Sequence, residues 1–526
     1  MSSSILQDLD SVESSSITGT PTATDSSHGT KFSESEVASE FPKCIPPTHS
    51  ACTLVLCFDG TGDQFDSDNS NIVEFFTMLK KDDREKQMVY YQAGIGTYTS
   101  PKIATPLAAK ISKTLDEMIA WNLDAHVMDG YEFLMQNYKA GDRICIFGFS
   151  RGAYTARSLA GMIHKVGLLP ACNHQQVPFA YKMFTRVDEI GWQQSNVFKK
   201  AFSVDVPIEF IGVWDTVNSV GLIPRRLPFT TSNTIVRTFR HAIALDERRA
   251  KFKANLWNRP NEKEAKMGTT GQTPDVSKHK QHDHSAIGET GKRGSQGKKT
   301  LRKMERRYAD HLERPTDVEE VWFAGCHCDV GGGSVANGTP HTLARIPLRW
   351  MIRECFKADT GIMFMSESLK TVGLDPASLY PYVQERPPPL PGAGAHVEHI
   401  PSAADRKAES SVQTVIVPLN MMSEEEHELH DAMSPIYDQL SLAPFWWLLE
   451  LFPIEQRYQK GNKSWSSYIG INLGRGRFIP KQKKRMIKIH RSVKQRMDAQ
   501  YSDGTKYKPK ASFETALAIG NVNWVD

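Results

Sequence analysis

Short apolar runs alternate along this chain with longer segments in which apolar residues recur every three or four positions. The short runs are rich in β-branched and aromatic residues and predict strands buried on both faces. They lie at residues 52–58, 88–91, 144–147, 206–214 and 319–325. The periodic segments predict helices at 71–79, 115–138, 153–163, 234–252 and 343–356. This alternation predicts an α/β fold with a mostly parallel central sheet, flanked by helices and joined by right-handed crossovers.

Three segments lack this periodicity, and we expect them to be disordered. Residues 1–50 are rich in Ser, Thr, Asp and Glu, and residues 258–299 are rich in Lys, Gly, Thr and His. Such segments bury too little apolar surface to offset the entropy that ordering costs. Residues 387–409 have polyproline character. We therefore expect an α/β domain over 51–357 and a helical or irregular region over 358–526 that packs on it.

The strand predicted at 144–147 runs into Gly148-Phe149-Ser150-Arg151-Gly152, a G-x-S-x-G pattern followed by a predicted helix. A strand, a tight turn with serine at its apex and a helix are the setting of a nucleophilic serine. The turn crowds its flanking positions, so only very small residues fit there. The N–H group of Arg151 would lie at the helix N-terminus and could stabilise an oxyanion.

The first predicted strand ends in Asp59-Gly60-Thr61, at the carboxyl end of the sheet, where α/β folds place their sites. A backbone amide of Asp59, Gly60 or Thr61 is therefore our candidate for a second oxyanion donor. The alternative is a plain polar turn with a side-chain cap. Phosphate binding is weakly indicated, because the third glycine of the dinucleotide pattern and the lysine of a P-loop are both missing.

Two further strand ends carry candidates for an acid and a base. Asp215 follows the strand at 206–214 and would orient a histidine, and His327 follows the last predicted strand, in a loop rich in glycine. The chain order serine, aspartate, histidine is that of the α/β-hydrolases. His241 is an alternative base, although it precedes the last predicted strand. Asp329 is an alternative acid, or a cap of the same loop.

The composition narrows the classes of ligand that we expect the protein to bind. The net charge of +4 and the pI near 8.4 are too mild to indicate nucleic-acid binding. The eight cysteines form no paired metal-ligand pattern, because Cys326-His327-Cys328 lacks a second ligand pair, so we predict neither a metal site nor a cofactor. The sequence gives no indication of oligomeric state.

The chain shows no signal peptide and no apolar run of about 18 residues, so we predict a cytoplasmic protein without a membrane span. The most apolar stretch outside the predicted core is 442–454. It could be a lid or a membrane-facing surface, which would make the protein membrane-peripheral. Packing into the core is the interpretation that we favour.

Four motifs together, CFDGTG, GFSRGAYTAR, GVWDTV and AGCHCDVGGG, resemble the α/β-hydrolase domain of the type VI secretion phospholipase effectors of the first class, which has uncharacterised fungal relatives. The resemblance covers residues 54–356 well and continues loosely through NLGRGR and IHRSVKQR. It implies that Ser150 is a nucleophile, Asp215 an acid and His327 a base. It also implies hydrolysis of carboxylic esters, with phospholipid acyl esters as the leading substrates. The alternatives are a catalytically silent scaffold with the same fold and a hydrolase of small acyl esters or thioesters.

Overall fold

The structure is a computed structural model, and it describes residues 41–60, 63–94, 108–217, 227–258, 301, 304–306, 315–400, 422–444, 446–451, 453–459, 465–479, 486–513 and 522–526. The chain divides into two compact units, Met1–Phe41 and Pro42–Asp526. The elements described below belong to the second unit.

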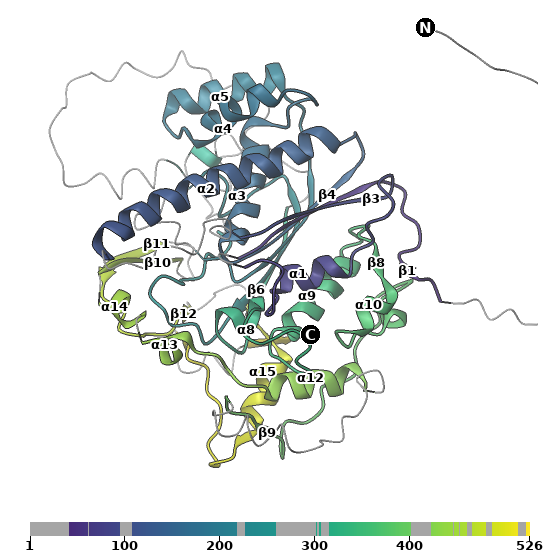
Figure 1. Ribbon diagram of the computed structural model, residues 1–526, viewed down its shortest axis with the longest axis vertical. Helices are drawn as coiled ribbons and strands as arrows, with labels where there is room; N and C mark the ends of the chain where they lie inside the picture. Colours follow the sequence, from purple (N-terminus) through teal and green to yellow (C-terminus); the bar gives the residue numbers. More distant parts are fainter. Residues whose placement is uncertain are drawn as a thin grey trace, which may run out of the picture. The chain divides into compact units, whose positions relative to one another are not determined.

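An eight-stranded sheet organises this unit, with the strand order β16-β13-β7-β6-β5-β4-β2-β3. Helices lie on both of its faces (Figure 1). All of its neighbouring strands pair in parallel. The fold is therefore of the α/β-hydrolase-like class that the sequence predicted. The strands are β2 (Thr53–Phe58), β3 (Gln87–Gln92), β4 (Arg143–Phe149), β5 (Ile208–Trp214), β6 (Val236–Ala244), β7 (Asp317–Phe323), β13 (Ile487–His490) and β16 (Val522–Val525).

The inner strands are apolar because helices cover both faces of the sheet. Every residue of β2 is buried, and its side chains alternate between two hydrophobic clusters. Val55 and Cys57 pack in one cluster with α1 and α9, whereas Leu54 and Leu56 pack in the other with α2, α3 and α4. The helices are α1 (Asn71–Thr77), α2 (Ala108–Asn137), α3 (Ser150–Val166), α4 (Val177–Thr185), α5 (Glu189–Phe202), α8 (His327–Gly331), α9 (Arg345–Lys357), α10 (Ser366–Lys370), α12 (Glu424–Met433), α13 (Gln439–Leu442), α14 (Trp446–Glu450) and α15 (Arg491–Asp498), with short 3-10 turns η1 (His174–Gln176) and η3 (Pro376–Ser378).

The strand order reverses at β2. The chain passes from β2 to its neighbour β3 on one side and then returns to β4 on the other. In parallel sheets, a site forms at the carboxyl ends of the strands around such a reversal. The ends of β2 and β4, with those of β5 and β7 beyond them, therefore define where the predicted residues meet.

The helix predicted over 234–252 is wrong, because this segment contains strand β6, which pairs in parallel with β5 and β7. Its polar residues are spaced as on an exposed helical face, but Arg240 and His241 are buried and have partners from distant parts of the chain. Arg240 pairs with Glu354 and Asp317, and the Nδ1 atom of His241 lies 3.2 Å from Glu320. Contacts with other parts of the chain thus replace the solvent that the spacing suggested.

Two of the segments expected to be disordered contain ordered structure. Within 1–50, strand β1 (Cys44–Ile45) pairs antiparallel with β8 (Phe364–Met365), and Ile45 is fully buried. Within 387–409, the backbone oxygens of Pro387 and Leu390 accept hydrogen bonds from side chains of α15. A polyproline backbone leaves its carbonyl groups free for such contacts. Residues 1–40, 259–299 and 401–409 of the predicted segments lie outside the described residues.

The region 358–526 does more than pack against the sheet, because it supplies β13 and β16. β13 pairs with β7 through Lys488 and Ile489, and β16 pairs with β13. Three small sheets complete the region. They are the antiparallel pair β10 (Ile454–Gln459) and β11 (Trp465–Gly470), and the parallel pairs β12 (Phe478–Ile479) with β15 (Ser512–Phe513) and β9 (His396–Val397) with β14 (Gln500–Tyr501).

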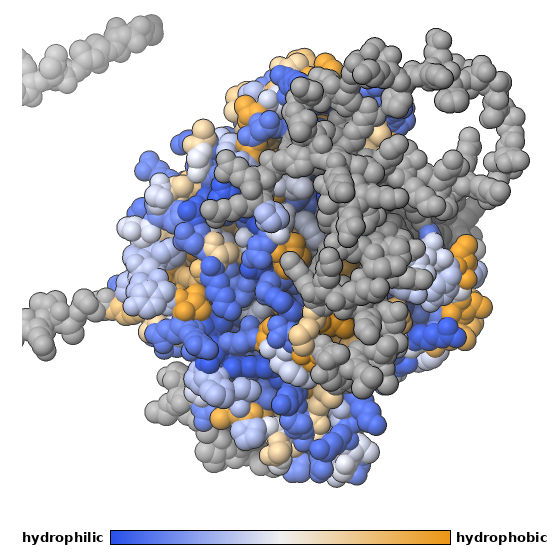
Figure 2. All heavy atoms as spheres, turned by 180° about the vertical axis from the view of Figure 1, so that it is seen from behind, coloured by the Kyte–Doolittle hydropathy of each residue, from blue (hydrophilic) through white to orange (hydrophobic). Residues whose placement is uncertain are grey.

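The apolar stretch at 442–454 does not pack into the core as we favoured. Several apolar side chains of α13, α14 and the residues around β11 are exposed instead, and hydrophobic surface gathers at the right-hand edge of Figure 2, where these elements lie. We call this set the apolar surface; it comprises Leu442, Trp447, Leu448, Leu451, Tyr468, Ile469, Ile471 and Leu473. Among the described helices, none is both long and apolar enough to cross a membrane.

Candidate active site

Ser150 stands where β4 ends and α3 begins, with no connecting loop between them. Its φ of 57° is in the left-handed region, which is strained for a residue with a side chain. A Cβ atom on Gly148 would lie 2.5 Å from Gly152 O, and one on Gly152 would lie 2.3 Å from Phe58 O. Backbone atoms cannot yield as side chains do, so both positions of the turn require glycine.

Ser150, His327 and Asp215 form one chain of hydrogen bonds. Ser150 Oγ lies 2.7 Å from His327 Nε2, and His327 Nδ1 lies 2.5 Å from Asp215 Oδ2. His327 is the first residue of α8, just after β7, and Asp215 directly follows β5 with a φ of 39°. The structure thus brings together the three residues that the sequence singled out as nucleophile, base and acid.

The surroundings of His327 favour its neutral form. Burial lowers the pKa of the imidazole, and Asp215 offsets this effect only in part. The rings of Phe149 and Phe252 lie 4.7 and 4.8 Å from the imidazole, centroid to centroid. Because the Asp215 carboxylate can only accept hydrogen bonds, the proton of neutral His327 resides on Nδ1. The Nε2 atom is then an acceptor for the Ser150 hydroxyl.

Asp215 is fully buried and ionised. Burial raises the pKa of its carboxyl group, but the charge of Arg477 and hydrogen bonds from His327 and Arg477 lower it more, so that it lies well below the usual value. Its Oδ1 atom accepts from the Ala244 N–H group at 3.0 Å and from Arg477 Nη1 at 2.5 Å. An ionised carboxylate in this position stabilises a positively charged imidazole.

This arrangement is chemically competent for nucleophilic catalysis. A serine hydroxyl is a weak nucleophile until a neighbouring base removes its proton. An imidazole fixed between a hydroxyl and a carboxylate can take that proton and later return it to a leaving group.

The two alternative residues are engaged elsewhere. His241 Nε2 accepts from the Thr216 N–H group at 3.1 Å, while its Nδ1 atom faces Glu320. The Asp329 carboxylate accepts from the N–H groups of Cys326 and Tyr437 at 2.8 and 3.0 Å. Burial raises the pKa of Asp329 to about 7. Asp329 therefore caps the start of α8, the helix in which it lies, and contacts Tyr437. Asp215 is the carboxylate that contacts His327.

The candidate oxyanion donors are placed differently from one another. The Asp59 N–H group donates to Gln92 O at 3.0 Å, and the Gly60 N–H group donates to Asp59 Oδ1 at 2.8 Å. Both amides are thus engaged, and Asp59 behaves as the turn cap of the alternative interpretation. Thr61 lies outside the described residues. The Arg151 N–H group lies in the first turn of α3, where amides have no partner within the helix.

Sequence reasoning missed the side chains from other segments that surround Ser150, His327 and Asp215. Glu247 accepts from the backbone N–H group of His327 at 3.3 Å and pairs with Arg249. The Arg249 guanidinium lies 3.5 Å from the centroid of the Phe252 ring. Glu247, Arg249 and Phe252 lie within the helix that the sequence predicts over 234–252, so their position beside His327 could not be predicted. Arg477 occurs in the NLGRGR motif, but nothing near it in sequence indicates its contact with Asp215.

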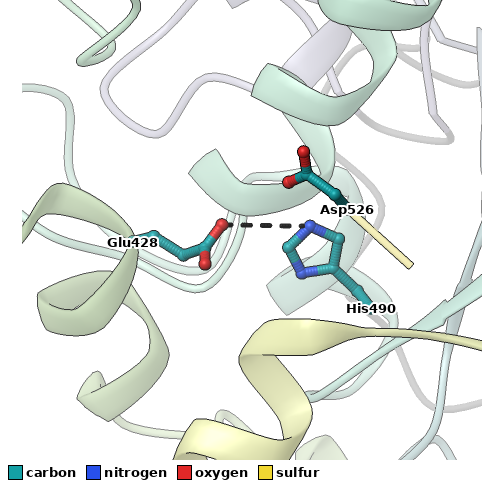
Figure 3. Close-up of side chains that lie close together, drawn as sticks. All are labelled: Glu428, His490 and Asp526. Carbon is teal, nitrogen blue, oxygen red and sulfur yellow. Dashed lines mark ion pairs between the residues drawn. The ribbon is translucent and has the colours of Figure 1, made fainter. Parts of the chain in front are cut away.

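Among the described residues, one group of side chains has the geometry of a metal site, and it lies apart from the triad. Glu428, His490 and Asp526 bring one ligand atom each within 4.8 Å of the others (Figure 3). Arg386 already pairs with both carboxylates at 2.6 and 2.7 Å, and Arg491 contacts Glu428 at 2.8 Å. A cation would have to displace these guanidinium groups, so we interpret the group as an ion-pair network that joins α12 to α15 and β16.

Comparison with known protein families shows which family this chain belongs to. Residues 52–354, more than half of the sequence, match the family described as type VI secretion system phospholipase effector Tle1-like, catalytic domain. The chain belongs to this family. Membership supports a hydrolase of lipid esters, in agreement with the resemblance carried by the four motifs.

Similar proteins come from a fungus and a bacterium. An uncharacterized protein of Saccharomyces cerevisiae is 27% identical over 549 residues, which cover 85% of this chain and 79% of that protein. A crystal structure of an uncharacterized protein from Pseudomonas aeruginosa is 17% identical, with a TM-score of 0.31, over 64% of this chain and 49% of that chain. The Tle1 effector bound to the VgrG spike is 17% identical, with a TM-score of 0.26, over 55% and 52%. The match spans about half the length of these two solved chains.

Proposed function

We propose that this chain is a serine hydrolase of carboxylic esters and that phospholipid acyl esters are its substrates. The observation that carries the proposal is the hydrogen-bonded chain from Ser150 through His327 to Asp215. Three side chains from distant parts of the sequence meet there, at the carboxyl ends of β4, β5 and β7.

In the proposed reaction, His327 Nε2 takes the Ser150 proton as Ser150 Oγ attacks the ester carbonyl carbon. Asp215 holds the imidazole in the tautomer with the proton on Nδ1 and stabilises the imidazolium ion that forms. The Arg151 N–H group donates to the oxyanion; losing one such donor raises a barrier by about 3 kcal/mol. His327 then returns the proton to the departing alcohol, and a water molecule activated by the same imidazole releases the fatty acid.

Two observations support a lipid substrate. The family is one of phospholipase effectors. The apolar surface offers a second argument, because a soluble chain that exposes contiguous apolar side chains commonly uses them for binding. The ring of Trp446, at the start of α14, lies 5.6 Å from that of Phe252, which contacts His327. We therefore propose peripheral contact with a lipid surface through the apolar surface, close to the triad.

Labelling with a fluorophosphonate probe tests the nucleophile, because such probes react only with an activated serine. We expect the wild type to be labelled and Ser150→Ala to be unlabelled. Incubation of both proteins with phospholipid vesicles, followed by lipid product analysis, tests the substrate. We expect free fatty acid and lysophospholipid from the wild type alone.

The same experiments separate the alternatives. No labelling of the folded wild type would reject the hydrolase and indicate a scaffold with a hydrolase fold. Labelling with no vesicle hydrolysis, but with turnover of short-chain esters or thioesters, would reject phospholipids as substrates and retain the serine mechanism.

A further inference from the structure

Arg477 reaches the buried acid of the triad from the C-terminal region, 262 positions along the chain from Asp215. Its Nη1 atom lies 2.5 Å from Asp215 Oδ1, and its Nη2 atom lies 2.8 Å from Asp215 Oδ2. The pair is bidentate and dry, because the side chains of Arg477 and Asp215 are 3% and 0% exposed. The family match ends at residue 354, so this arginine lies outside the region that defines the catalytic domain.

The guanidinium group is fully satisfied in this position. Besides Asp215, it donates to the backbone oxygen of Ala244 at 3.0 Å and to that of Phe252 at 3.1 Å from Nε and 2.6 Å from Nη2. These contacts use every N–H group that arginine possesses. A lysine could keep the charge but not the planar fork that fixes both carboxylate oxygens.

The segment that carries Arg477 is held in place on both sides. Asn472 donates to the backbone oxygen of Arg248 and to Glu450, and the Gly474 N–H group donates to Glu450 as well. After Arg477, its own carbonyl accepts from the Ser512 N–H group at 2.8 Å. A Cβ atom on Gly476 would lie only 2.0 Å from Lys510 O, so the segment packs closely on the chain that follows β14. The guanidinium is therefore presented to Asp215 from a fixed support.

Charge explains why this contact would matter for the reaction. His327 is neutral at rest, so Arg477 supplies the positive charge that keeps the buried Asp215 ionised. Among the described residues, Glu247 and Arg249 also lie close to His327, and they pair with each other. Glu247 and Lys253, which carry opposite charges, lie close to Arg477. Without Arg477, the uncompensated carboxylate would hold a proton on His327 more strongly.

We propose that Arg477 is a positioning residue of the triad, which acts through Asp215 and makes the C-terminal region part of the active site. This inference rests on the proposed function, so wild type and Ser150→Ala are assayed first on a soluble ester. If the wild type hydrolyses neither the soluble ester nor phospholipid vesicles, the proposed function fails, whatever Arg477 does.

The test compares Arg477→Gln, Arg477→Lys and the control Arg353→Gln in the full chain. Arg353 is also buried and pairs with a carboxylate, Glu424, but has no contact with the triad. For Arg477→Gln, we expect kcat to fall about 100-fold, as for a small misplacement of a catalytic group, with little change in KM. The midpoint of the acidic limb of kcat/KM should move up by about one pH unit, because a neighbouring cation shifts a buried group by at least that much.

For Arg477→Lys, we expect a lower kcat but no shift in the midpoint of the acidic limb of kcat/KM. Lysine keeps the positive charge but loses the planar fork that fixes both carboxylate oxygens. Arg353→Gln should change neither kcat nor the limb, even if its melting temperature falls. The inference is overturned if both Arg477 variants keep the wild-type kcat and pH profile. If Arg477→Gln does not fold, the lysine variant decides: a reduced kcat in a folded protein supports the inference. Failure of the lysine variant to fold would assign Arg477 a structural role and overturn it.

Discussion

Replacing Asp215 with asparagine tests which carboxylate serves His327. Four N–H groups point at the two oxygens of Asp215, from Arg477 (two), His327 and Ala244. An asparagine offers one oxygen, so its amide nitrogen must face some of these donors. If the amide nitrogen takes the place of Oδ1, it opposes two donors that cannot change, the Ala244 N–H group and Arg477 Nη1. If it takes the place of Oδ2, it opposes Arg477 Nη2 and His327. The second orientation is less costly, because the imidazole can move its proton from Nδ1 to Nε2.

That tautomer cannot accept the Ser150 proton. The corresponding change in a serine protease lowers kcat about 10⁴-fold, and we expect a similar loss here, or about 5 kcal/mol of barrier. The substitution also leaves the Arg477 charge unpaired, which costs about 3–5 kcal/mol of stability in buried pairs. The assay is kcat on a soluble ester, measured at a temperature where circular dichroism shows the variant to be folded.

Asp329→Asn is the matched control. Its carboxyl group is also buried, but burial raises the pKa of Asp329 to about 7, so the neutral form already costs little near neutral pH. Its contacts are with Cys326, Tyr437 and Ser334, none of which is a triad residue. We expect kcat to fall by less than about tenfold. Equal losses in the two variants, or a greater loss in Asp329→Asn, would refute the assignment of Asp215 as the acid.

Two further predictions concern pH and lipid contact. The rate constant kcat/KM should rise with pH and level off with a midpoint below the ordinary histidine pKa of 6.5. The reason is that burial lowers the pKa of His327 and only its neutral form accepts the Ser150 proton. A midpoint above about 7, in a pH series on a soluble ester, would contradict this prediction. Leu448→Asp, at a side chain that is 64% exposed, should weaken vesicle binding roughly tenfold, as loss of one buried leucine would, and leave soluble-ester hydrolysis unchanged. Phe179→Asp, at an exposed side chain of α4, is the control in a vesicle sedimentation assay, and equal loss in both variants would argue against the apolar surface as the contact.

The local apolar composition of the sequence could reveal the strands that are buried in the sheet. The runs at 52–58, 88–91, 144–147, 206–214 and 319–325 all became strands of the central sheet, because helices cover both faces and leave little room for polar residues. The candidate positions Ser150, Asp215 and His327 could be proposed because each lies just beyond the end of such a strand, and in a parallel sheet those ends share one side.

What the sequence could not reveal depends on partners far along the chain. β6 carries Arg240 and His241 in the sheet, and their partners come from β7 and α9. β13 and β16 are only four residues long, too short for a periodic signal. Arg477 could not be predicted for the same reason, because its contact is with a carboxylate 262 positions away in the chain.

The addition of β13 beside β7 bears on how the protein can be handled. A fragment cut at residue 354, where the family match ends, would lose β13 and leave the outer side of β7 uncovered. That side would present a row of unpaired backbone donors and acceptors next to the buried Val321 and Trp322. Such exposed edge strands pair with other copies of themselves and aggregate. Preparations of this fragment alone should therefore precipitate, whereas a polypeptide that extends through β16 keeps β7 paired with a strand of its own chain.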